Sequence, residues 1–215
     1  MHSKALGVRR VTAVQRIDDE TLRVTRTVGP DVVVFCPDSP RGAILTEEVA
    51  QNWLERTPDG DFAAFAPTCT AEGAYELLRA KGIAVGTFGD LSAALERETS
   101  VSSHLPRLAG YIERRLRTHH QVEEIQWNSH LIYRVLCRAG RGDLRAAFGE
   151  PYEVSADWVL ARVESSVFPL DAVVTSNPNC SRIAATASAV GRDAGVRVLT
   201  MSEFLSALHR PWPAD

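Results

Sequence analysis

The sequence predicts an α/β protein made of two tandem, similar β-α-β-α-containing domains, each with a mixed sheet flanked by helices. Three observations support this prediction: apolar strand-like runs alternate with amphipathic helical patterns, glycines follow the helical patterns, and residues 61–97 align with residues 171–210. The 215 residues, 45% of them hydrophobic, suffice for one large core or two small ones. We therefore expect domains over residues 1–99 and 100–215 that pack with pseudo-twofold symmetry.

The two aligned segments share one order of elements: an apolar strand, a polar turn, an amphipathic helix, a short strand and a short acidic helix. The identical pairs include Asp61 and Asp171, Pro67 and Pro178, Cys69 and Cys180, Ala74 and Ala185, Gly82 and Gly195, Val85 and Val198, Thr87 and Thr200, Leu95 and Leu208, and Arg97 and Arg210. Apolar strands joined by a helix pair in parallel through a right-handed crossover. The alignment therefore predicts an internal duplication.

The segments before the aligned pieces also match, although more loosely. The first half has the strand-like runs VTAVQRI, TLRVTRTV and DVVVFC, and the second half has IQW and HLIYRVLC, all rich in β-branched or aromatic residues. Thr46 before EEVAQNWLER and Ser155 before ADWVLARVES are suitable N-cap residues. Each half is therefore expected to place antiparallel strands and a helix before the β-α-β-α piece.

An amphipathic helix is predicted between the halves, over SHLPRLAGYIERRLRTHHQ. Its apolar stripe, at spacings of three and four, consists of Leu105, Leu108, Ile112 and Leu116. Arg107, Arg114 and Arg117 fall on the opposite side. The helix either connects the halves or opens the second one, and we favour the second position.

Charge is distributed unevenly along the chain, whose formal net charge is −3. Residues 101–145 hold eight arginines against four acids, a local charge of +4 between two acidic segments. Such a region suits phosphate binding. Trp127 and Tyr133 within it suit stacking on single-stranded bases, but both also fit a half-buried strand. The candidate nucleic-acid-binding residues are Arg107, Arg114, Arg117, Arg134 and Arg138. The alternative is a solvated basic face without a partner.

A Pro-x-Cys-Ser/Thr motif occurs in both halves, where an apolar strand ends and a helix is expected to begin. A helix start can lower the pKa of a thiol or bind an anion through its free N–H groups. The side chains of this candidate anion or thiol site are Cys69, Thr70, Asn177, Asn179, Cys180 and Ser181. The alternative is a turn that these residues merely build, because no glycine-rich phosphate cradle accompanies them.

No arrangement of residues typical of catalysis stands out. The acids of residues 18–20 are typical of a turn, and Glu123 with Glu124 opens a strand without an evident partner. The four cysteines are far apart and form neither a zinc motif nor a disulfide framework. No catalytic residue, metal ion or cofactor is therefore predicted.

The repeated piece resembles the C-terminal half of restriction-endonuclease-like domains of the Mrr type. The resemblance covers DAVVTSNPNCSRIAATASAVGRDAGVRVLTMSEFLSAL and its counterpart in the first half. Such domains carry an Asp on one strand and Glu-x-Lys on the next, which hold a divalent metal that activates water. This chain has neither, and Glu124-Ile125-Gln126 is its nearest approach. The resemblance thus implies a scaffold of nuclease-like ancestry whose role is binding or assembly.

The leading hypothesis is a cytoplasmic, non-enzymatic binding or assembly module, since the sequence has no signal peptide and no apolar run long enough to span a membrane. DNA or RNA, a partner protein and a second copy of the chain are the partners left open, and a membrane is not expected. Two alternatives remain: a divergent metal-dependent nuclease that uses Glu124, and a thiol-based redox or anion-binding protein that uses Cys69 and Cys180.

Overall fold

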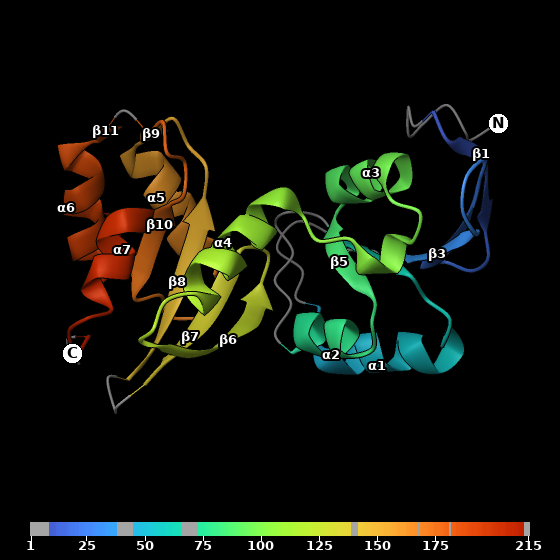
Figure 1. The fold of residues 1–215 in the computed structure, drawn as a ribbon, viewed down its shortest axis with the longest axis horizontal. Coiled ribbons are helices and arrows are strands. Elements are labelled where there is room, and N and C mark those ends of the chain that lie inside the picture. The colour runs from blue at the N-terminus through green and yellow to red at the C-terminus, as the bar shows by residue number, and fades with distance from the viewer. Residues whose placement is uncertain are drawn as a thin grey trace. The chain divides into compact units, whose positions relative to one another are not determined.

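The protein folds into two compact units, Met1–Pro106 and Arg107–Asp215, in a computed structural model. The structure describes residues 9–37, 45–65, 73–138, 142–166, 168–180 and 182–212. The unit boundary lies a few residues after the one expected between residues 99 and 100. Each unit contains a mixed five-stranded sheet with helices against it (Figure 1), which confirms the predicted α/β class.

The sheet of the first unit has the strand order β1-β2-β3-β4-β5. Its strands are β1 Val11–Arg16, β2 Thr21–Arg26, β3 Val32–Phe35, β4 Phe62–Phe65 and β5 Ala84–Thr87. Its helices are α1 Glu47–Arg56, α2 Ala74–Ala80, α3 Phe88–Arg97 and the short 3₁₀ helix η2 Val101–Ser103. The first three strands pair antiparallel and the last three pair parallel, because only the later strands are separated by helices.

Helices lie against both faces of this sheet (Figure 1). On one face, Leu91 and Leu95 of α3 pack into a cluster that includes Phe62. On the other face, Trp53 of α1 stacks on Phe35 with ring centroids 4.6 Å apart. The aromatic rings of this second face are fully buried, so they anchor α1 to the sheet.

The sheet of the second unit has the strand order β12-β10-β8-β7-β6. Its strands are β6 Val122–Ser129, β7 Ile132–Cys137, β8 Asp143–Gly149, β10 Ala172–Thr175 and β12 Arg197–Thr200, and β9 Glu153–Val154 pairs with β11 Arg182–Ile183 in a separate small sheet. Its helices are α4 Arg107–Arg117, α5 Ala156–Glu164, α6 Ala185–Asp193 and α7 Met201–Ala207. The pairing again changes from antiparallel (β6-β7-β8) to parallel (β8-β10-β12).

Helices α5 and α6 cover one face of this sheet, where Val159 and Ala187 pack with Val173. Helix α7 covers the other, where Phe204 meets Phe148 edge-to-face at 5.6 Å. Helix α4 packs against β6 and opens the second unit, as we favoured. Contrary to the predicted stripe, Leu105 lies before the helix and is 37% exposed.

The two units share one connectivity, three antiparallel strands followed by two helix-joined parallel strands. The same hydrogen bonds begin the aligned pieces: the Asp61 carboxylate accepts from the Val33 N–H at 2.9 Å. Likewise, the Asp171 carboxylate accepts from the Arg145 N–H at 2.6 Å. The aligned segments therefore follow similar paths within their own units, while descent from a duplicated gene stays a prediction.

Local sequence signals account for the ends of several helices. Thr46 accepts from the Val49 N–H at 3.3 Å and so caps α1 as predicted. Ser155 caps α5 in the same way. Gly82 and Gly195 have φ angles of +77° and +72°, a conformation that glycine adopts without strain, so the chain can turn from α2 to β5 and from α6 to β12.

Candidate nucleic-acid interface

Helix α4 separates its apolar and cationic residues onto opposite faces. Ile112 and Leu116 are fully buried, whereas all four arginines of the helix are exposed. The only acid of the helix, Glu113, is also buried and accepts a hydrogen bond from the Trp127 indole N–H at 2.8 Å. Because this carboxylate points at the sheet, the solvent-facing side of α4 carries cations without an acid of its own.

Most of these guanidinium groups have no anionic partner in the described part of the chain. Arg107, Arg114 and Arg115 make no hydrogen bond or ion pair there through their side chains, and Arg117 approaches Glu113 only to 3.5 Å. Arg107 and Arg114 lie two turns apart on one side of the helix, about 10 Å along its axis. We call Arg107, Arg114, Arg115 and Arg117 the α4 arginine row.

The two other predicted arginines do not extend this row. Arg134 on β7 is neutralised by Asp143 on β8, with Nη2 2.6 Å from Oδ2. It also lies on the face of the sheet that packs against α5 and α6, because its strand neighbour Tyr133 points to the opposite face. The Arg138 side chain donates to the Val122 carbonyl oxygen at 3.3 Å. The five predicted arginines thus do not form one surface.

The predicted stacking residues are part of the core. Tyr133 is fully buried and Trp127 is 5% exposed. The two rings meet edge-to-face with centroids 5.0 Å apart. Of the two alternatives for these residues, their burial therefore favours the strand, and neither ring is exposed for stacking on bases.

Glu124, the candidate metal ligand, is exposed on β6 and accepts a hydrogen bond from Gln126 at 3.3 Å. Within the described ranges, no group of three or more His, Cys, Asp or Glu side chains could hold a metal ion. One exposed carboxylate does not position a metal or activate water. The geometry around Glu124 therefore offers no support for a nuclease site.

The Asn177–Cys180 turn is held by its own polar groups. The Asn179 N–H donates to Asn177 Oδ1 at 2.9 Å, and Asn177 Nδ2 donates to the Pro151 carbonyl at 3.2 Å. Contrary to expectation, α6 does not follow Cys180 directly, because β11 lies between them. Cys180 is therefore not the residue at which the helix begins. Cys69, Thr70 and Ser181 lie outside the described residues.

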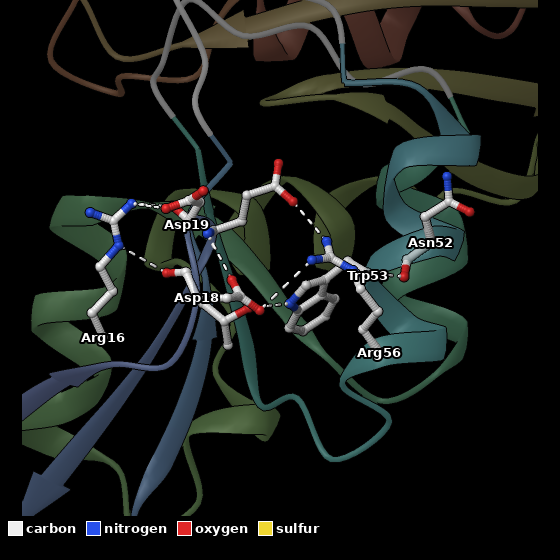
Figure 2. A network of polar contacts seen from close by, with 8 residues as sticks. Arg16, Asp18, Asp19, Asn52, Trp53 and Arg56 are labelled. Carbon is white, nitrogen blue, oxygen red and sulfur yellow. Dashed lines mark hydrogen bonds and ion pairs between the residues drawn. The ribbon is translucent and has the colours of Figure 1, made fainter.

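A second group of charges links the β1–β2 turn to α1 (Figure 2). The sequence indicated the acids of this turn but not their arginine partners. Arg56 Nη2 lies 2.8 Å from Glu20 Oε2, and its Nη1 lies 3.7 Å from Asp18 Oδ2. Arg16 bridges to Asp19 at 2.7 Å within the turn. These residues line an open pocket with a volume of about 1280 Å³. We call this group the β1–β2 charge network.

Every charge of the β1–β2 charge network has an internal partner. The pKa of Asp18 is lowered, first by the hydrogen bond from the Glu20 N–H at 2.8 Å and also by Arg56. Cys36 lines the same surface, and burial raises its pKa to about 12. This surface therefore offers no free cation and no thiolate near neutral pH, and its charges hold the turn against the helix.

No protein-family model matches the chain, and no curated protein or solved structure matches it either. In the part of the chain that the structure describes, no helix is both long and apolar enough to cross a membrane. The case for a function therefore rests on the geometry of the two charged regions.

Proposed function

We propose that the protein is a non-enzymatic binding or assembly module whose second unit binds the phosphate backbone of DNA or RNA through the α4 arginine row. The observation that carries this proposal is the absence of acceptors for Arg107, Arg114 and Arg115 within the described chain, while Glu113 is buried. Guanidinium groups pair with phosphate oxygens and release condensed counterions when they do so.

Contact with phosphates, without reading of bases, is what this geometry supports best. The row lies on a helix whose other face is committed to the sheet, and the aromatic residues that could stack on bases are buried. Backbone contacts of this kind carry little sequence information. We therefore expect binding that depends strongly on salt and weakly on nucleotide sequence.

The proposal also covers ancestry and location. A scaffold of nuclease-like ancestry that has lost its metal ligands would keep a nucleic-acid-facing surface without cleaving its ligand. Cys36 and Cys180 are free thiols, which suits a reducing compartment, and we propose a cytoplasmic location.

Fluorescence anisotropy with a short labelled DNA duplex, its single strand and the matching RNA tests the proposal between about 50 and 200 mM salt. The double variant Arg114→Gln/Arg117→Gln is expected to reduce the slope of log K against log salt by about 2, one unit per lost phosphate contact. The matched control is Arg23→Gln/Arg192→Gln, which removes two exposed arginines outside α4.

Two results would contradict the proposal. One is wild-type protein that retains no nucleic acid, or retains it independently of salt. The other is a control variant that weakens binding as much as the α4 variant, which would indicate a general charge effect. Circular dichroism of both variants shows whether the fold is intact.

A further inference from the structure

Three imidazole rings meet at one place in the second unit, where two helices end. His119 and His120 follow α4, and His209 follows α7. Ring centroids are 5.1 Å apart for His119 and His120, 5.0 Å for His119 and His209, and 4.9 Å for His120 and His209. Each ring therefore contacts the other two, although the histidines come from opposite ends of the unit's sequence.

The hydrogen bond from Gln121 specifies the neutral form of His119. Its Nδ1 accepts from the Gln121 N–H at 3.3 Å, so this nitrogen carries no proton. A further hydrogen bond joins the ring to the Leu205 backbone next to the end of α7. Protonation of Nδ1 would replace the Gln121 hydrogen bond by a clash between two N–H groups.

The charges around His119 oppose its protonation. Its pKa is lowered, first by burial and then by His209, His120 and Arg115, and only the Leu205 hydrogen bond acts in the other direction. The C-terminal carbonyl groups of α4 and α7 favour one positive charge near the rings. A positive charge on His120 or His209 would lie about 5 Å from the His119 ring and would oppose the protonation of His119.

We propose that His119, His120 and His209 form a proton-sensitive clasp that joins the α4–β6 turn to the end of α7. Neutral rings pack and hold the two helix ends together, and successive protonation separates them. The clasp is independent of the proposed nucleic-acid binding, since it rests on the ring contacts of the three histidines and on the hydrogen bonds and charges around His119. Where that binding holds, the same protons add positive charge beside Arg114, Arg115 and Arg117.

A metal site fits the same rings less well. The His119 ring makes hydrogen bonds with the backbone of both Gln121 and Leu205. Its nitrogen lone pair is therefore already used, and the described residues contain no three-donor group that could hold a metal. Proton binding, which needs no such convergence of donors, is the chemistry that the geometry favours.

NMR titration of the histidine ring signals from about pH 8 to pH 5, in EDTA, tests the clasp. His119 is expected to titrate below its ordinary range with a Hill coefficient under one. His209→Gln is expected to raise the pKa of His119 and to sharpen its titration, because one neighbouring charge is removed. The matched control His130→Gln, in the β6–β7 turn, is expected to leave His119 unchanged.

Three results would overturn the clasp. The first is His119 titrating independently, at its ordinary pKa, in the wild type. The second is a His209→Gln variant that folds but leaves the His119 titration unshifted. The third is a saturable one-to-one shift of all three rings on addition of ZnCl₂ without EDTA, which would identify a metal site. All three are measured without nucleic acid, so they do not bear on the α4 arginine row.

Discussion

The β1–β2 charge network and the α4 arginine row are both rich in exposed arginine side chains. Of the two, only the α4 arginine row has guanidinium groups without an acidic partner among the described residues. Arg16 and Arg56 are 65% and 51% exposed, but each lies within 2.8 Å of a carboxylate oxygen. On α4, the only acid of the helix faces the sheet. The difference teaches that the direction in which neighbouring acids point, more than the number of arginines, decides whether a surface can bind an anion.

The comparison depends most on Glu113 remaining buried. Glu113→Ala leaves the Trp127 indole N–H without its acceptor, so we expect it to lower the free energy of unfolding by about 2 to 3 kcal/mol. Glu113→Gln keeps an acceptor oxygen and should cost clearly less. Urea denaturation measures both, with Glu123→Ala on the exposed side of β6 as the control, expected within about 0.5 kcal/mol of wild type. Equal stability of Glu113→Ala and wild type would show that this carboxylate does not anchor α4.

Charge reversal sharpens the comparison at the level of binding. Arg114→Glu on α4 is expected to weaken nucleic-acid binding on the order of tenfold, about 1.4 kcal/mol, because it removes one phosphate contact and adds a repulsive charge. Arg16→Glu makes the same change of charge in the β1–β2 charge network and is expected to weaken binding much less. Anisotropy at a fixed salt concentration compares the two, and similar losses would erase the distinction between the regions.

The smallest expected effect concerns the paired charges themselves. Because the folded-state pKa of Asp18 is lowered, its contribution to stability is present above its ordinary value of 3.8 and disappears as pH falls through the folded-state pKa. Asp18→Asn should therefore lower the free energy of unfolding by less than about 1 kcal/mol at pH 7, as is usual for exposed pairs. It should have no effect at a pH where Asp18 is protonated in both the folded and the unfolded protein. Urea denaturation at pH 7 and at about pH 2 checks this, and an equal loss at both values would assign the effect to packing.

Much of the fold could be predicted because its signals are local. Thr46 and Ser155 cap helices where the sequence places them, and Gly82 and Gly195 adopt the left-handed conformation that ends a helix. Strands joined by helices pair in parallel as expected. The short strand β11 was missed because two residues carry too little pattern to distinguish it from the start of a helix.

The candidate site was harder to predict. Three of the proposed arginines lie together on α4, and Arg115 completes the row, but Arg134 has a partner in Asp143 across the sheet. Trp127 and Tyr133 looked equally suited to a binding surface or a strand, and their burial decides for the strand. A pattern of residue types shows which side chains could bind a ligand, but not which of them the fold has already engaged.

By itself, the sequence determined the α/β class, the order of strands and helices in the aligned segments except for β11, and the amphipathic character of α4, since these follow from periodicity and turn chemistry over short stretches. Only the tertiary structure decided which charges are paired and which titratable groups meet. Arg56 on α1 contacts Glu20 in the β1–β2 turn. His209 contacts His119 and His120, although it is separated from them by most of the sequence of the second unit. Such contacts depend on how strands and helices pack. Salt screens exposed charges over roughly 10 Å, so titratable groups influence each other strongly only where the fold brings them close together.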